Sequence, residues 1–266
     1  MTGDKMKNPK IYLTGDCHGD YLRFSTSAFP EQKEMTRDDY VIIMGDFGYW
    51  DNSPEQRYWR KWLEEKPFII LFVDGNHENY DMLSALPEEH WMGGKVHRIG
   101  KNILHLMRGQ IYNFAGHKWF AMGGAPSHDI QDGILDPDDP DFRQKYYIYS
   151  QKGAMFRVLH RSWWPEEMPS VDEYKEAGRN LSANENKVDF ILSHEAPFDI
   201  ARRIGCSHYT SNELSEWFDN RVLKQVEFKA WFFGHYHIEY VCRNVFGMYK
   251  RIISLDEIES YLNSKE

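Results

Sequence analysis

Short apolar runs rich in β-branched and aromatic residues recur along the chain and predict the strands of a sheet. In the first third they lie at Lys10–Thr14, Tyr40–Met44 and Phe68–Val73. Between them, segments near Asp20–Phe29 and Ser53–Glu65 predict helices, and the second begins with a typical N-cap serine followed by proline. Such alternation is typical of a parallel sheet with helices on its faces. Because the run Phe68–Val73 is uninterrupted, we expect that strand to be buried on both faces.

The pattern changes after a short predicted helix at Glu78–Ala85. Three short apolar runs follow within Gly94–Gly124, at Ile103–Met107, Ile111–Phe114 and Lys118–Met122, and glycine-containing turns separate them. This spacing indicates antiparallel hairpins. We expect them to continue the same sheet.

Residues 125–187 depart from the strand pattern and are called the excursion below. Asp132–Asp141 is dense in Asp and Pro, and a helix is predicted at Val171–Leu181. Long loops in compact domains are usually functional. We therefore expect one domain spanning residues 1–266, in which the excursion runs over the active-site face.

Strands resume after the excursion. Apolar runs at Val188–Leu192, Lys229–Phe233, Ile238–Val241 and Tyr249–Ile253 predict strands, and a helix fits Ser211–Gln225. No apolar run approaches the roughly 20 residues needed to cross a bilayer, so no membrane partner is expected.

Five polar clusters stand out, and most of them directly follow a predicted strand. They are Gly15-Asp16-Cys17-His18-Gly19, Gly45-Asp46, Gly75-Asn76-His77-Glu78, Ser193-His194 and Gly234-His235-Tyr236-His237. Open α/β sheets build their sites at the carboxyl ends of strands. Asp16 and His18 lie two residues apart, so on an extended chain both side chains leave the same face, and His235 and His237 repeat this spacing. Carboxylate, amide and imidazole donors suit manganese, iron, cobalt or zinc, whereas calcium prefers oxygen throughout.

The order of these clusters resembles the calcineurin-like metallophosphoesterase family. The signature of that family runs GDxHG, GD, GNHE, a single His after a strand, and GHxH, and every part is present from Gly15 to His237. The resemblance implies a four-layer α/β sandwich, with two mixed β-sheets packed face to face and helices outside. It also implies two divalent metal ions, with manganese, iron and zinc as the favoured candidates, and a phosphate ester as substrate.

The resemblance further implies a role for each donor. One ion would be held by Asp16, His18, Asp46 and His237, and the other by Asp46, Asn76, His194 and His235. Asp46 would bridge the two ions, and His77 would lie beside the leaving-group oxygen as a proton or hydrogen-bond donor. Hydroxide held between the ions would attack phosphorus. Glu78 is interpreted as the residue that starts the following helix, because acidic residues favour helix N-termini.

The substrate is less constrained, and phosphodiesters and phosphomonoesters both stay open. The protein Ser/Thr phosphatase branch shows GDxVDRG, but the arginine is missing from Gly45–Trp50, which argues against a phosphoprotein substrate. Gly123–Asp129 is the candidate substrate loop, in which His128 would touch phosphate or nucleoside; Asn76 is also expected to face the substrate. The candidates for a phosphate clamp are Arg143, Arg157, Arg161, Arg202 and Arg203.

Composition narrows the functional class further. The net charge of −9 disfavours non-specific nucleic-acid binding but not a nucleotide substrate, because bound metal ions invert local charge. Cys17, Cys206 and Cys242 offer no disulfide framework, and Met1–Lys10 has no apolar signal core, so a cytoplasmic location is expected. The alternative function is a metal-binding scaffold without turnover. Such scaffolds typically lose a ligand or the GNHE histidine, and this chain retains all of them.

Overall fold

The first sheet of the protein is built around four parallel strands. The computed structural model describes residues 8–205 and 210–265, so Cys206 and the first seven residues lie outside it. In the described residues the strand order is β15-β1-β2-β3-β6-β5-β4. Strands β1, β2, β3 and β6 are parallel, whereas β15, β5 and β4 are antiparallel to their neighbours. The strands are β1 (Ile11–Thr14), β2 (Tyr40–Ile43), β3 (Ile69–Phe72), β4 (Glu88–Trp91), β5 (Gly94–Arg98), β6 (Ile103–Leu106) and β15 (Ile253–Ser254).

The second sheet is also mixed, with antiparallel strands at its two edges. Its order is β13-β14-β12-β11-β8-β7. Strands β8, β11, β12 and β14 run parallel, and β7 and β13 are antiparallel to their neighbours. The strands are β7 (Gln110–Phe114), β8 (His117–Met122), β11 (Phe190–Ser193), β12 (Ala230–Phe233), β13 (Tyr240–Cys242) and β14 (Val245–Gly247).

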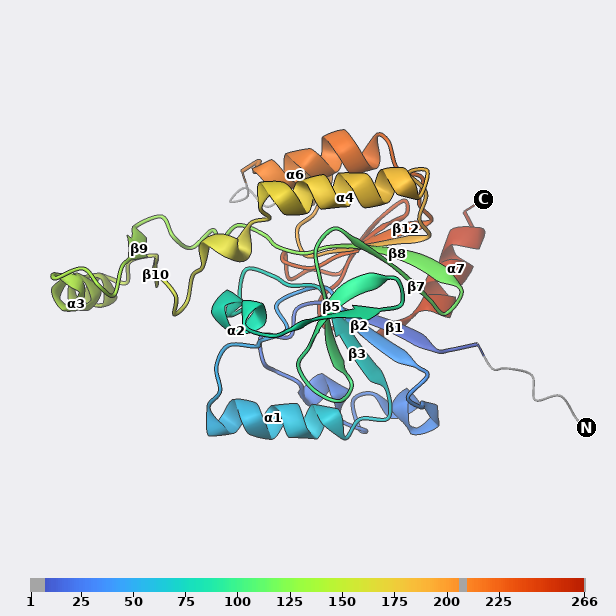
Figure 1. The fold of residues 1–266 in the computed structure, drawn as a ribbon, viewed down its shortest axis with the longest axis horizontal. Helices are drawn as coiled ribbons and strands as arrows, with labels where there is room; N and C mark the ends of the chain where they lie inside the picture. Colours follow the sequence, from blue (N-terminus) through green and yellow to red (C-terminus); the bar gives the residue numbers. More distant parts are fainter. Residues whose placement is uncertain (1–7, 206–209, 266) are drawn as a thin grey trace, which may run out of the picture.

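Helices cover the outer faces of the two sheets (Figure 1). Helix α1 (Pro54–Glu64) lies along the first sheet, and Ser53 caps it by accepting from the Gln56 N–H, as predicted. On the second sheet lie α4 (Val171–Ala183) and α6 (Glu213–Trp217), which runs on into a π-helical segment, Phe218–Leu223. The remaining helices are α2 (Tyr80–Ser84), α5 (Phe198–Ile204) and α7 (Leu255–Asn263). None of the helices in the described part of the chain is both long and apolar enough to cross a membrane.

Three apolar clusters hold these layers together. The central one packs both sheets face to face, with Leu71 and Val96 on one side and Trp119 and Phe232 on the other. The second lies between the second sheet and helices α4 and α6, and the third lies between the first sheet and α1. Burial of both sheet faces explains why the parallel strands are continuous apolar runs. The predicted four-layer α/β sandwich with two mixed sheets is confirmed.

Several predicted elements are wrong in type or position. The predicted helix near Asp20–Phe29 is absent, and 3₁₀ turns form instead at Leu22–Phe24 and Pro30–Glu34. Proline disfavours a helical residue before it, and the Gln32 side-chain amide contacts the carbonyls of Phe24, Ser25 and Phe29, which holds the segment in this shape.

The hairpin region is divided between the sheets. Strands β4, β5 and β6 complete the first sheet, but the β7–β8 hairpin begins the second, so the expectation of one continued sheet is wrong. The predicted strand Tyr249–Ile253 is also wrong, because the strands there are β14 and β15. The Tyr249 carbonyl accepts instead from Gly15 N and Arg23 Nη1, which holds this segment against the loop after β1.

The excursion contains more structure than its sequence predicts. Beyond α4 it forms β9 (Gly133–Leu135), α3 (Phe142–Lys152), β10 (Phe156–Val158) and a 3₁₀ turn at Pro165–Glu167. Strands β9 and β10 pair in parallel, and with α3 they extend away from the sandwich (Figure 1). None of the α3 residues is buried. Residues 133–158 are called the projecting arm below; the division of the chain into one domain with an excursion stays a prediction.

Candidate metal centre

The predicted metal ligands follow strands of both sheets, at their carboxyl ends. Asp16 and His18 follow β1, Asp46 follows β2, Asn76 and His77 follow β3, His194 follows β11, and His235 and His237 follow β12. Because the two sheets pack face to face, these loops meet at one end of the sandwich. Donors more than 200 positions apart in the sequence are thereby brought into contact, as the 2.8 Å between His18 Nε2 and His237 Nε2 shows.

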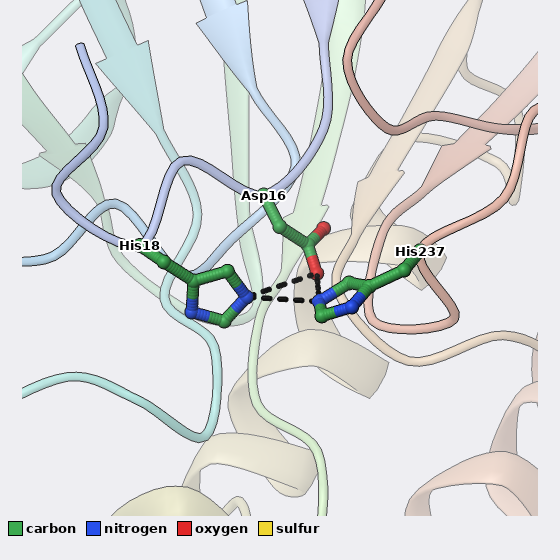
Figure 2. Close-up of side chains that lie close together, drawn as sticks. All are labelled: Asp16, His18 and His237. Atoms are coloured by element: carbon green, nitrogen blue, oxygen red, sulfur yellow. Dashed lines mark hydrogen bonds and ion pairs between the residues drawn. The ribbon is translucent and has the colours of Figure 1, made fainter.

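Asp16, His18 and His237 form one group of donors, drawn in Figure 2. The Nε2 atom of His237 lies 3.1 Å from Asp16 Oδ2, and that of His18 lies 3.8 Å from the same oxygen. The Asp16 carboxylate accepts from the backbone N–H of His235 at 3.0 Å, which links the first and last clusters. The ligand atoms of this group lie within 4.8 Å of one another.

Asp46 lies between the two halves of the site. Its Oδ2 atom is 3.5 Å from His18 Nε2 and 3.4 Å from His194 Nε2. Asp16, Asp46 and His194 form a second group of possible ligands, and His18, Asp46 and His77 a third. Asp46 therefore lies within reach of both sides, as a bridging ligand must.

Asn76 and His235 complete the side of the site that contains His194. The Asn76 Oδ1 atom lies 3.3 Å from His194 Nε2. The His235 ring stands edge-to-face against the His194 ring, with centroids 5.0 Å apart. All seven predicted ligands thus meet in one place, and their assignment to particular ions stays a prediction.

A backbone contact sets the tautomer of His194. Its Nδ1 atom lies 2.7 Å from the Met44 carbonyl oxygen, which can only accept, so Nδ1 carries the proton. The lone pair of neutral His194 is then on Nε2, which faces Asp46 and Asn76. Metal-binding histidines typically use their other ring nitrogen in this way.

The electrostatics of the site favour a bound cation. Asp16 and Asp46 are each 1% exposed, and buried carboxylates are costly unless a positive charge compensates them. Although burial opposes protonation, the charges of Asp46 and Asp16 raise the pKa of His194 to about 10. A ring that attracts a proton this strongly lies in a negative potential. Two carboxylates, one amide and neutral imidazoles therefore fit a pair of borderline divalent ions.

The backbone of the loops is strained where it carries the donors. Positive φ angles, uncommon outside glycine, occur at His18 (48°), Asp46 (47°), His235 (67°) and His237 (52°). Such strain clusters at functional sites, where the surrounding structure must hold it.

At two of the cluster positions, Gly45 and Gly75, the neighbouring side chains leave no room for a Cβ atom. A Cβ atom on Gly45 would overlap the His194 ring, and one on Gly75 would overlap the Asp46 carboxylate. Each glycine thus lets its own loop approach a donor from another loop, which explains why these two clusters begin with glycine.

His77 lies beside the donors and contacts an arginine of the projecting arm. Its backbone N–H donates to Asp46 Oδ1 at 2.9 Å. The two Nη atoms of Arg157 each lie 3.2 Å from a His77 ring nitrogen, and because neutral imidazole has a single acceptor nitrogen, at most one of these contacts is a donated hydrogen bond. Arg157 also forms a two-pronged ion pair with Asp129, at 2.7 Å on each oxygen.

Charge and burial act together on the His77 ring. Burial, reinforced by the positive charge of Arg157 and opposed by Asp46, lowers the pKa of His77 to about 4. A neutral ring retains one N–H group, which can donate a hydrogen bond to an oxygen of a substrate.

The structure also locates His128, Cys17 and Glu78. His128 is exposed at the rim, with its ring centroid 5.9 Å from that of His235. Cys17 is buried, which raises its thiol pKa to about 12, so it is an inert thiol. The interpretation of Glu78 as a helix-start residue is wrong, because Asn79 caps α2. Glu78 instead accepts from the N–H groups of residues 47–49, which holds the loop after Asp46 in place.

Comparison with known proteins identifies the family. A profile of the calcineurin-like phosphoesterase family matches residues 9–239. The chain belongs to this family. The match confirms the resemblance that the order of the polar clusters indicates.

Relatives of known function are lariat debranching enzymes. The chain is 22% identical over 259 residues to lariat debranching enzyme A of Xenopus laevis, covering 87% of this chain and 43% of that enzyme. It is 25% identical over 211 residues to the lariat debranching enzyme of Caenorhabditis briggsae, covering 72% of this chain and 37% of that enzyme. The chain thus spans less than half the length of these relatives. A solved structure, the phosphopantetheinyl hydrolase of Mycobacterium tuberculosis, aligns with a TM-score of 0.41 and 16% identity over 91% of this chain and 88% of that one.

The family signature does not include several residues that support this calcineurin-like site. Arg157 is one of five arginines that the sequence offers as candidates, and only the fold brings it to His77. Ser127 and Glu167 hold Asn76 through hydrogen bonds. Ser127 lies in the candidate substrate loop and Arg157 is among the candidate phosphate clamps, but no signal in the sequence indicates that either residue supports a predicted metal ligand or His77, and Glu167 carries no signal at all.

Proposed function

We propose that this chain is a phosphodiesterase that uses two divalent metal ions. Asp16, His18, Asp46 and His237 would hold one ion, and Asp46, Asn76, His194 and His235 the other. The observation that carries the proposal is the convergence of these donors on Asp46, next to His77 and Arg157. A complete donor set also favours an enzyme over a scaffold without turnover.

The side chains around the ions have distinct tasks in this proposal. When bound, the ions supply positive charge that polarises a phosphate and activates water. The two buried carboxylates fix that charge, and the Met44 carbonyl keeps His194 in the tautomer that presents Nε2. His77, a neutral ring, donates a hydrogen bond to the departing oxygen. Arg157 packs on His77 and keeps its ring in place.

Charge balance supports a diester substrate. A diester carries one negative charge, whereas a terminal phosphate approaches two. The loop after Asp46 lacks the arginine of the protein phosphatase branch, and Arg157, which the projecting arm supplies, is already paired with Asp129. The pair has no net charge, so it offers little extra attraction to a dianion. The relatives are named for debranching lariats, and we propose a nucleotide-containing diester as the substrate class here.

A comparison of two nitrophenyl esters tests the proposal. Manganese-loaded protein is expected to cleave bis-nitrophenyl phosphate at least as fast as nitrophenyl phosphate, and a chelator is expected to stop both reactions. Asp46→Asn serves as the inactive control for contaminating phosphatases. A strong preference for the monoester would refute the diesterase proposal, and no turnover of either ester with two ions bound would favour the scaffold.

The metals, the location and the domain boundary are part of the same proposal. The mixed oxygen and nitrogen donors favour manganese, iron or zinc, and elemental analysis of the purified protein is the measurement. The cytoplasmic location rests on the three scattered cysteines and is tested by imaging a tagged chain. Limited proteolysis tests the proposal of one domain with an excursion. Cleavage confined to residues 125–187 is the expected result.

A further inference from the structure

The orientation of the Asn76 amide depends on a neighbour outside the predicted site. Asn76 is 1% exposed, and its Nδ2 atom donates to Ser127 Oγ at 3.2 Å. Its Oδ1 atom therefore faces His194 Nε2, at 3.3 Å. Only the oxygen of an amide binds a cation, whereas a flipped amide would point two N–H donors at it. The contact with Ser127 thus determines that the oxygen of the Asn76 amide, and not its nitrogen, faces the metal site.

Glu167 in turn determines whether the Ser127 hydroxyl accepts or donates a hydrogen bond toward Asn76. The Ser127 hydroxyl donates to Glu167 Oε2 at 2.7 Å, and the Ser127 backbone N–H donates to Glu167 Oε1 at 2.8 Å. A hydroxyl has one proton, so once it is donated to Glu167 the oxygen has only lone pairs to offer Asn76. Glu167 is 3% exposed. Burial of a carboxylate costs free energy unless hydrogen bonds compensate it, and the two bonds from Ser127 provide that compensation.

Arg108 connects the segment that carries Glu167 to the segment that carries Asn76. Its Nη2 atom donates to the carbonyl of Glu166 at 2.7 Å, just before Glu167. The same atom and Nε bind Asp74 Oδ2, at 2.5 and 2.8 Å, two residues before Asn76. One buried guanidinium therefore joins the excursion to the loop after β3.

We propose that Glu167 and Ser127 are positioning residues that present the Asn76 carbonyl oxygen to the cation beside His194. This inference rests on the proposed two-ion site, in which Asn76 is a ligand of one ion only. Binding of that ion then depends on the excursion, whereas the ion held by Asp16, His18 and His237 does not. The predicted result of breaking these contacts is a protein that binds one ion tightly and the second ion weakly.

Calorimetric titration of the metal-free full chain with Mn²⁺ tests this asymmetry. Wild type is expected to bind two ions. Ser127→Ala and Glu167→Gln are expected to weaken the second ion by roughly 10- to 100-fold, as loss of residues that orient metal ligands does, and to leave the first unchanged. Because both act on one amide, the double variant should be no weaker than Ser127→Ala. Glu166→Gln, the same change on an exposed neighbouring side chain, is the matched control and should bind both ions as wild type does.

A spectroscopic measurement separates positioning from a general loss of structure. With two equivalents of Mn²⁺, electron paramagnetic resonance should show a coupled pair in wild type and Glu166→Gln, and mainly isolated Mn²⁺ in Ser127→Ala and Glu167→Gln, at unchanged unfolding temperature. Two ions bound at wild-type affinity in both variants would overturn the inference. So would equal weakening of both ions together with a lowered unfolding temperature. Fewer than two ions in wild type would instead contradict the proposed two-ion site itself.

Discussion

The strand-end loops and the projecting arm differ in how firmly they are packed and in what they contribute to the site. The loops carry buried donors on strained backbone, and each is held by contacts from other loops. The arm has a helix, α3, with no buried residue, and Tyr147 on it is 66% exposed. Yet the arm sends one side chain, Arg157, to the centre of the site. The metal-binding donors are therefore built into the core, whereas the guanidinium that contacts His77 comes from a loosely packed addition to it.

The largest effect is expected from the loops. Asp46→Asn should lower turnover by roughly a thousandfold, because it removes the negative charge that faces both His18 and His194. The fold should persist, since the amide has nearly the same shape. Turnover, metal content and the unfolding temperature are the measurements, and near-wild-type activity with two ions bound would exclude Asp46 as the bridge.

The next effect concerns His77, where loop and arm meet. His77→Ala should retain both metals and lose roughly 10²- to 10⁴-fold in rate for substrates with poor leaving groups, where a hydrogen bond to the departing oxygen matters most. The measurement is the rate for a series of esters with leaving groups of increasing pKa. If the rates for alkyl and nitrophenyl esters fall equally, His77 does not stabilise the departing oxygen in the slowest step.

The sequence predicted the loops far better than the arm, for a physical reason. Each predicted donor follows an apolar run, and burial of that run in the sandwich places the donor at the sheet edge. The projecting arm has no such apolar pattern, because α3 buries no residue and its Tyr146 and Tyr149 rings contact Phe156 of the same arm. The 3₁₀ turns after β1 and the contact between Tyr249 and Arg23 were missed for a related reason, since single side-chain hydrogen bonds determine them. Ser127, Arg157 and Glu167 likewise act through contacts that only the fold creates.

A smaller effect is expected within the arm itself. Arg157→Gln should lower turnover of a diester roughly tenfold, because the His77 ring loses the side chain that holds it in place, and should change the unfolding temperature little. Arg157→Lys should not restore turnover, because an ammonium cannot make the two-pronged pair with Asp129 that places the guanidinium on His77.

Steady-state kinetics of the Arg157 variants should be read beside Arg161→Gln. Arg161 is exposed, and its guanidinium carbon lies 5.5 Å from the centre of the Phe142 ring. Because Arg161 lies just outside the projecting arm, equal effects at both positions would mean that positive charge in this region, and not the specific contact of Arg157, is what matters.

The smallest effect is expected at the rim. His128→Ala should raise the Michaelis constant by roughly threefold and lower turnover less, as expected when one modest hydrogen bond is made equally in the ground and transition states. Unchanged kinetics would remove His128 from the substrate loop. A larger effect on turnover than on the Michaelis constant would give it a role in the chemical step.

Anomalous diffraction from crystals of the manganese-loaded protein is the most direct test of the two-ion site. We expect two peaks on either side of Asp46, one bounded by Asp16, His18 and His237 and the other by Asn76, His194 and His235. A single peak, or a peak away from the strand-end loops, would contradict it.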